Sequence, residues 1–223
     1  HPVKALQESN DHLFSLVEYH IVKRSLIDRK GRTAFRTTSS FPRENDKMAK
    51  DFVILNDMAY VAHGTTGISK LDPFIGKLIK EISLSSLGEE FKRSMATGIA
   101  HINDRILVAV NLSGGGSFQG MLEFDEDLNL IKKMAYPRRL LINPKIQVDG
   151  DLVYYKSNGD IHVFNYNSLE DGVDLVAAKI IKRIKGEFIA SNPAIKDGVF
   201  YGCLRKVQNG KFVYKYREVE IKL

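Results

Sequence analysis

A two-residue turn signal recurs along this chain at nearly constant spacing. Each copy separates a short apolar run from a second, more apolar run, and the five copies are Asn10-Asp11, Asn56-Asp57, Asn103-Asp104, Asp149-Gly150 and Asp197-Gly198. Their separations are 46, 47, 46 and 48 residues. Self-similarity at about 40 to 50 residues is typical of repeat architectures, and in propellers each repeat is a blade of four strands. We therefore expect each signal to be a hairpin at the same place in successive blades.

Aligned on these turns, each unit reads as four strands. Strand A, before the turn, is predicted at 3–8, 51–55, 99–102, 145–148 and 194–196, and strand B, after it, at 13–17, 58–62, 106–110, 152–155 and 199–204. Strand C is predicted at 21–27, 68–71, 121–124, 161–164 and 212–216, and strand D, for example, at 77–84 and 129–134. Strand B is richest in β-branched and aromatic residues, as a buried middle strand should be. Residues 84–95 have room for a helical turn between blades, and residues 218–223 are the candidate outer strand of the last unit.

These patterns predict an all-β fold, a single β-propeller domain over residues 1–223 with about five four-stranded antiparallel blades. The predicted repeats are residues 1–46, 47–93, 94–139, 140–187 and 188–223. Blades would stack because one such sheet cannot bury both apolar faces alone. The alternative, a linear β array or a sandwich, does not require near-identical hairpin spacing.

The sequence begins at a predicted strand A and ends at a candidate outer strand. The first and fifth units are therefore expected to share no strand. The ring then closes by side-chain packing alone, or the five units are part of a larger six- or seven-bladed ring.

Composition narrows the classes of protein and of partner. The chain has 43% hydrophobic and 27% charged residues, as in an ordinary globular protein, and no apolar run long enough for a membrane span. Its net charge of +6 comes from basic pairs spread over every unit and mostly interleaved with acids. Such spreading favours solvated blade edges over a nucleic-acid surface. The single cysteine, Cys203, is predicted to be a buried, inert thiol, and neither a metal site nor a cofactor is expected.

Polar residues occur where a propeller places its ligand site. The loops that lead into strand A and those that join strands B and C meet at one mouth of the central channel. The predicted ligand-binding residues are Lys50, Thr97, Asn143 and Asn192 before strand A, and His63, Asn111, Lys156 and Arg205 from the B–C loops. Their amide, hydroxyl, imidazole and cationic donors suit an anionic or hydroxyl-rich ligand. The Asn-Pro pairs at 143–144 and 192–193 are equally well explained by turn chemistry.

Other motifs indicate structure rather than catalysis. The Gly-rich stretch from Ser113 to Ser117 lacks the Lys-Ser or Lys-Thr of a phosphate-binding loop and reads as a flexible B–C hairpin. Asp28, Asp72 and Asp125 follow three C strands, in different units and at the end opposite the mouth. They are interpreted as turn residues rather than metal ligands or a glycosidase pair. The six histidines have no fixed spacing, and no Ser-His-Asp triad is indicated.

Several segments carry a family resemblance. Lys70-Leu-Asp-Pro-Phe-Ile-Gly-Lys-Leu-Ile79 resembles the Asp-x-x-x-Gly-Lys hairpin of quinoprotein-like repeats, without the Trp that follows there. More of the chain resembles the TolB-like six-bladed propellers of Gram-negative bacterial lipoproteins. The segments that resemble them are Leu26-Ile-Asp-Arg-Lys-Gly31, Phe41-Pro42, Leu122-Glu-Phe-Asp-Glu-Asp127 with Lys132-Lys133, and Val199-Phe-Tyr-Gly-Cys-Leu-Arg205. The resemblance implies an exported protein of the periplasm or cell surface, of unassigned activity. It also favours a further blade upstream of His1 and leaves room for a lipid anchor there.

The functional prediction is a non-catalytic propeller that presents its polar mouth to a protein partner or to a small polar, anionic or carbohydrate ligand. The alternative is a propeller hydrolase that acts on a glycan or phosphoester through carboxylates at the mouth. Nucleic-acid binding ranks below both. The first two differ in one feature, because a hydrolase needs two or more carboxylates in one pocket and the eight predicted mouth residues include none.

Overall fold

The computed structural model describes residues 5–18, 20–27, 32–38, 49–112, 118–136, 144–157, 160–181, 187–189, 194–197, 199–209 and 211–220. Four of its sheets are four-stranded antiparallel meanders in simple chain order. Blade 1 contains β1 (Ala5–Ser9), β2 (His12–Val17), β3 (His20–Ser25) and β4 (Thr33–Arg36). Blade 2 contains β5 (Asp51–Leu55), β6 (Met58–Ala62), β7 (Ile68–Asp72) and β8 (Lys77–Ile82).

The next two blades repeat this order. Blade 3 contains β9 (Ser94–Ile102), β10 (Arg105–Leu112), β11 (Gly120–Phe124) and β12 (Leu130–Ala135). Blade 4 contains β13 (Lys145–Asp149), β14 (Leu152–Ser157), β15 (Asp160–Asn165) and β16 (Lys179–Ile181). Two short 3₁₀ turns, η2 (Leu84–Leu87) and η3 (Glu89–Phe91), connect blades 2 and 3, where a helical turn was expected, and η4 (Tyr166–Ser168) follows β15.

The fifth sheet departs from the predicted blade. It consists of β17 (Glu187–Ile189), β18 (Ala194–Lys196), β19 (Val199–Gln208) and β20 (Lys211–Glu220). β17 and β18 pair with different parts of one edge of β19, and β20 pairs along the other edge. The prediction of an outer strand at 218–223 was therefore wrong for residues 218–220, which continue β20. The cause is a hairpin that pairs Gln208 with Lys211 and has Asn209, whose φ is 50°, in its turn. The two strands that it joins, β19 and β20, are ten residues long each.

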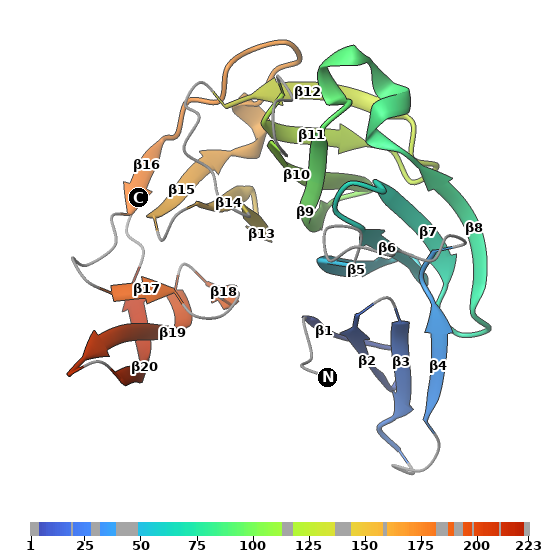
Figure 1. The fold of residues 1–223 in the computed structure, drawn as a ribbon, viewed down its shortest axis with the longest axis horizontal. Helices are drawn as coiled ribbons and strands as arrows, with labels where there is room; N and C mark the ends of the chain where they lie inside the picture. The colour runs from blue at the N-terminus through green and yellow to red at the C-terminus, as the bar shows by residue number, and fades with distance from the viewer. Residues whose placement is uncertain are drawn as a thin grey trace.

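The five sheets follow one another around a common centre (Figure 1). β1, β5, β9, β13 and β18 are innermost, and each of them contacts the next. β4, β8, β12 and β16 lie at the outside of the ring. The predicted fold class, an all-β propeller, is confirmed, with four regular blades and an irregular fifth sheet. β1 pairs with β2, and β20 with β19, which agrees with the expectation that the first and fifth units share no strand.

The repeated turns are all A–B hairpins. The register pairs Ser9 with His12, Leu55 with Met58, Ile102 with Arg105, Asp149 with Leu152, and Lys196 with Val199. The fourth loop is therefore residues 150–151, one residue later than predicted. The first loop residues, Asn10, Asn56, Asn103, Gly150 and Asp197, have φ between 45° and 55°. Residues without a bulky side chain adopt such angles most easily, which is why these types recur. With this correction the hairpins lie 46 or 47 residues apart.

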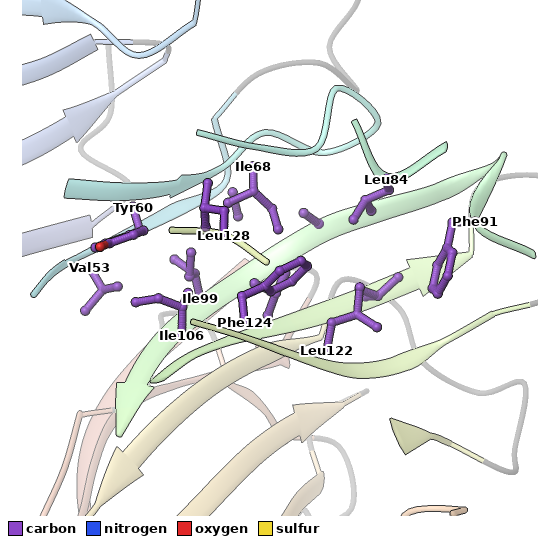
Figure 2. Close-up of a cluster of buried hydrophobic side chains, with 14 of the residues drawn as sticks. Val53, Tyr60, Ile68, Leu84, Phe91, Ile99, Ile106, Leu122, Phe124 and Leu128 are labelled. Atoms are coloured by element: carbon purple, nitrogen blue, oxygen red, sulfur yellow. The ribbon is translucent and has the colours of Figure 1, made fainter. Parts of the chain in front are cut away.

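The core lies between successive blades. Between blades 2 and 3 it contains Val53 and Tyr60 from one sheet and Ile99, Ile106 and Phe124 from the other (Figure 2). Similar clusters lie between blades 1 and 2 and between blades 3 and 4.

One repeat position shows what this stacking does. Four residues before the turn, Phe52, Ile99 and Ile146 are at most 4% exposed and join the cluster shared with the preceding blade. The equivalent residue of blade 1, Leu6, is 57% exposed. A neighbouring blade, rather than the sheet itself, is therefore what buries this position.

Candidate functional site

Three residues at one repeat position of the inner strands lie close together at one end of the channel. The residues five positions before the hairpin are Asp51 in blade 2, Gly98 in blade 3 and Lys145 in blade 4. The Lys145 ammonium lies 3.4 Å from Asp51 Oδ2 and donates a 2.7 Å hydrogen bond to the carbonyl oxygen of Lys50. A cation from blade 4 thus reaches past blade 3 to a carboxylate of blade 2.

Gly98 makes this reach possible. A Cβ atom on Gly98 would lie 2.9 Å from both Lys145 Cα and Ile146 N. These are backbone atoms of β13, which cannot rotate away as a flexible side chain can. A residue without a side chain therefore allows β9 and β13 to approach closely at this point.

Thr97 reinforces the same junction. The register of β9 and β10 shifts between Ala109 and Val110, so Thr97 is an extra residue on β9 at a β-bulge. Its hydroxyl donates to the carbonyl oxygen of Pro144 at 2.7 Å, across the boundary between blades 3 and 4. Bulges often re-aim a side chain in this way. The start of β13 is thus tied to both preceding blades.

A second lysine lies next to Lys145. Lys156 is the cross-strand partner of Lys145 on β14. Burial and the charge of Lys145 lower the pKa of Lys156 to about 8. Burial also raises the pKa of Asp51, and the opposing effect of Lys145 is smaller. We call Lys50, Asp51, Thr97, Lys145 and Lys156 the mouth cluster.

The structure brings part of the predicted site together. Lys50, Thr97 and Lys156 belong to the mouth cluster, although Lys156 lies within β14 rather than in a loop. Asn111 lies within β10 and is only 7% exposed. Arg205 lies within β19, also not in a loop, and Asn143 and Asn192 fall outside the described residues.

His63 follows β6 directly, as predicted for a mouth residue, but its side chain is buried. It is almost completely buried, and its Nε2 lies 2.8 Å from the hydroxyl of Ser69. That hydroxyl donates to the carbonyl oxygen of Thr37 in the segment after blade 1. His63 therefore donates from Nε2, and burial lowers its pKa to about 4. A histidine that donates to a buried serine does not act as its general base, so this pair is structural.

Sequence reasoning missed Asp51 and Lys145. Both lie within predicted A strands, whereas the predicted site consists of loop residues. A signal was present, because opposite charges occupy the same repeat position two units apart with glycine between them. If the repeats are arranged in a ring, that pattern indicates an ion pair between Asp51 and Lys145 that passes the glycine of the intervening blade.

The turns at the opposite end of the blades behave as predicted. The Asp72 carboxylate accepts hydrogen bonds from the backbone N–H groups of Phe74 and Ile75. The Asp125 carboxylate accepts from those of Asp127 and Asn129. Both aspartates are turn residues. Asp28 and residues 113–117 lie outside the described part of the chain.

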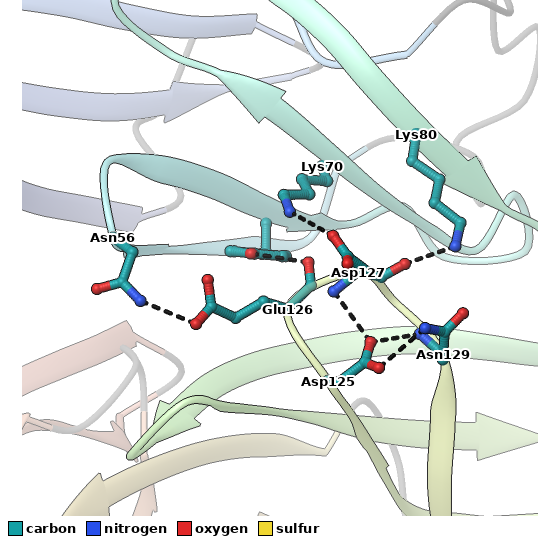
Figure 3. A network of polar contacts seen from close by, with 8 residues as sticks. Asn56, Lys70, Lys80, Asp125, Glu126, Asp127 and Asn129 are labelled. Carbon is teal, nitrogen blue, oxygen red and sulfur yellow. Dashed lines mark hydrogen bonds and ion pairs between the residues drawn. The ribbon is translucent and has the colours of Figure 1, made fainter.

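These turns also join neighbouring blades (Figure 3). The hydroxyl of Tyr60 donates to the carbonyl oxygen of Glu126 at 3.0 Å, and Lys70 pairs with Asp127 at 3.1 Å. Asn56 donates to the Glu126 carboxylate at 2.9 Å. The acidic side chains of this turn therefore serve blade-to-blade contact.

The described residues contain neither a metal-binding cluster nor a helix that could span a membrane. Across these ranges, no three His, Cys, Asp or Glu side chains are grouped so that they could hold a metal ion. None of the helices described there has the length and apolar character needed to cross a membrane.

Similarity to known proteins is structural. No protein-family model matches the chain, and no curated protein matches it in sequence. PorZ, an essential surface component of the type-IX secretion system of Porphyromonas gingivalis, aligns with a TM-score of 0.56 at 15% identity, over 98% of this chain and 27% of PorZ. The computationally designed protein Ika4 aligns with a TM-score of 0.50 at 11% identity, over 74% of this chain and 91% of Ika4. BamB from Moraxella catarrhalis aligns with a TM-score of 0.49 at 13% identity, over 97% of this chain and 63% of BamB.

At these identities the similarity concerns the fold alone. PorZ is a β-propeller protein, and the arrangement of sheets described above is of the same class. The chain is a β-propeller protein.

Proposed function

We propose that this propeller is a non-catalytic binding protein whose mouth cluster receives a polar ligand or a polar segment of a protein partner. The observation that carries the proposal is the position of two directly opposed lysines, Lys145 and Lys156, where Lys145 reaches the buried carboxylate of Asp51 on another blade. Partly buried cations at a channel mouth are costly to keep for stability alone, and perturbed groups of this kind cluster at binding sites. The other predicted residues proposed to line the same mouth are Asn111, Asn143, Asn192 and Arg205. His63 is proposed to stabilise the neighbouring loop through Ser69.

The arrangement supports binding better than hydrolysis. The carboxylate of the mouth cluster, Asp51, is held by Lys145 and by the backbone N–H of Phe52. A glycosidase mechanism instead needs two carboxylates on either side of the bond that breaks. Measured turnover of a glycan or phosphoester would overturn the non-catalytic part of the proposal.

We further propose that the protein is exported and belongs to the TolB-like six-bladed class. The support is the resemblance of the segments that begin at Leu26, Leu122 and Val199. PorZ, which shares the fold, is itself described as a bacterial surface component. Fractionation of the native cells would test the location, with the periplasm or cell surface expected.

The test of binding is a thermal-shift screen of glycans and anions. Wild type should be stabilised by at least one ligand, and the variants Lys156→Ala and Lys156→Ala with Arg205→Ala should lose that stabilisation. Lys77→Ala is the matched control, because Lys77 is an exposed lysine at the opposite end of blade 2. Stabilisation that survives in the double variant would reject the mouth as the site.

A further inference from the structure

We infer that β20 binds an extended segment of a partner protein, in which acidic and apolar residues alternate, as an added antiparallel strand. In this mode of recognition, main-chain hydrogen bonds provide affinity and alternate side chains provide specificity. The inference goes beyond the proposed function, because β20 belongs to the fifth sheet and not to the mouth cluster. It is carried by a missing outer strand, an unprotected edge and the charge pattern of β20.

The fifth sheet lacks the outer strand that the regular blades have. In blades 1 to 4 the third strand lies between the second strand and an outer fourth strand. By chain order β20 is the third strand of the fifth sheet, and among the described residues it pairs with β19 alone. Figure 1 accordingly shows no described strand on the far side of β20. A strand added there would restore the four-stranded order of the other blades.

The other outer edges have protection against strand addition that β20 lacks. β4, β8, β12 and β16 contain four, six, six and three residues. The pairings of β8 and β12 also contain a register shift each. A segment after η4 covers part of β12, because the N–H groups of Gly172 and Leu175 donate to its carbonyl oxygens. Short strands, bulges and covering segments all blunt an edge. β20 instead has ten residues in one continuous register with β19.

The hairpin determines which backbone groups of β20 face this edge. Its two-residue loop closes on the directly opposed pair Gln208 and Lys211, whose backbone groups point toward each other. Hydrogen-bonded and non-hydrogen-bonded pairs alternate along an antiparallel ladder. The N–H and C=O groups that point away from β19 are therefore those of residues 212, 214, 216, 218 and 220. An added strand would pair with these groups.

The sequence of β20 indicates which strand would fit. Alternate residues of a strand share a face. One face of β20 therefore has the cationic residues Lys211, Lys215 and Arg217, and the other has Phe212, Tyr214 and Tyr216, followed by Glu218 and Glu220. The β19 residues opposite the three cations are Gln208, Leu204 and Gly202, and none of these is acidic. A strand with acidic residues on the first face and apolar residues on the second complements this pattern.

The same charges disfavour a second copy of this chain as the occupant. Two antiparallel β20 strands related by a two-fold axis at Lys215 would place this residue opposite itself. With the axis at Tyr216, Lys215 would lie opposite Arg217. Like charges directly opposite each other destabilise a sheet. Acidic residues of a partner strand would instead face these cations in non-hydrogen-bonded pairs, where opposed side chains are closest.

The experiment is fluorescence anisotropy at pH 7 and low salt with a labelled peptide of the length of β20, in which Glu and Val alternate. Wild type should bind it, and should bind the corresponding Lys-Val peptide at least about 10-fold more weakly. Two N-methylated forms of the Glu-Val peptide test the geometry. Methyl groups on the Val nitrogens, which face β20 in the inferred register, should abolish binding. The same number of methyl groups on the Glu nitrogens should be tolerated, because these point away.

Variants of the protein test the charges. Lys215→Gln with Arg217→Gln should weaken binding of the Glu-Val peptide about 3- to 10-fold, because two opposed charge pairs are lost. Lys77→Gln, which removes an exposed lysine from β8, is the matched control and should leave the affinity unchanged. An acidic peptide also suits the mouth cluster, so Lys156→Ala is a second control with the same expected result. Circular dichroism checks that each variant is folded.

The outcomes separate this inference from the proposed function. If wild type does not bind the Glu-Val peptide, if the two N-methylated forms bind equally, or if the β20 double variant keeps full affinity, the inference is wrong. Binding that Lys156→Ala abolishes and the β20 double variant retains would support the mouth as a site and reject the added strand. A wild type that sediments as a dimer, and as a monomer after Tyr214→Pro removes an edge N–H, would make a second copy the occupant and overturn the inference.

Discussion

Two tyrosines at the same repeat position provide a matched test of how the blades are joined. Tyr60 and Tyr154 both lie on the second strand of their blades, opposite Val53 and Gln147, and both are at most 2% exposed. The hydroxyl of Tyr60 donates to Glu126 of the next blade at 3.0 Å. The hydroxyl of Tyr154 is buried and has no hydrogen-bond partner among the residues described.

The same substitution should therefore have opposite effects. Tyr60→Phe removes an interblade hydrogen bond and should lower the free energy of unfolding by about 1 kcal/mol, the usual net value of such a bond. Tyr154→Phe removes a buried polar group without a partner, whose desolvation costs about 1–3 kcal/mol. It should leave the protein unchanged or raise its free energy of unfolding by about 1 kcal/mol.

Urea denaturation followed by circular dichroism measures both values, with an unchanged m-value as the control for the unfolded state. The two variants should differ by about 1–2 kcal/mol, which for a chain of this size is a difference of roughly 2–8 °C in melting temperature. If Tyr154→Phe loses as much stability as Tyr60→Phe, then Tyr154 has an acceptor of its own. That result would refute the inference that the Tyr154 hydroxyl lacks an interblade hydrogen bond like the one that Tyr60 makes.

Three further predictions concern other parts of the ring. Gly98→Ala should cost about 1–3 kcal/mol, because its Cβ would overlap backbone atoms of β13, and an unchanged urea midpoint would contradict the close approach. Asp125→Ala should cost about 1–2 kcal/mol through the loss of its turn hydrogen bonds, and Asp125→Asn should recover part of that loss in the same assay. The pKa of His63 falls from its ordinary 6.5 to about 4 in the folded protein, so the unfolded state binds more protons between these values and stability falls as pH is lowered through them. His63→Gln should remove about 3 kcal/mol of the stability lost between pH 7 and pH 4, and equal pH profiles for the two proteins would show that His63 is not buried neutral.

The sequence alone was enough to predict the repeat and the antiparallel blades, because both depend on short-range chemistry. A two-residue hairpin needs residues that tolerate positive φ, and Asn, Asp and Gly at the five turns are visible without any knowledge of packing. The fourth turn was placed one residue early because Asp149-Gly150 and Gly150-Asp151 are equally good turn pairs. Only the pairing of Asp149 with Leu152 decides between them. In the fifth unit the strands were predicted too short, because the pair at 209–210 was not used as a turn signal.

The content of the mouth was decided by tertiary structure. Lys145 and Asp51 are 94 residues apart, and they meet because blades 2, 3 and 4 curve around one centre and Gly98 lets β9 and β13 approach. His63 shows the converse, since it is as polar as its neighbours at the predicted mouth but is buried beside Ser69, which bonds to the segment after blade 1. Polarity is a property of one residue and can be read from the chain. The direction in which that residue faces depends on how sheets from distant repeats pack, and only the folded ring determines it.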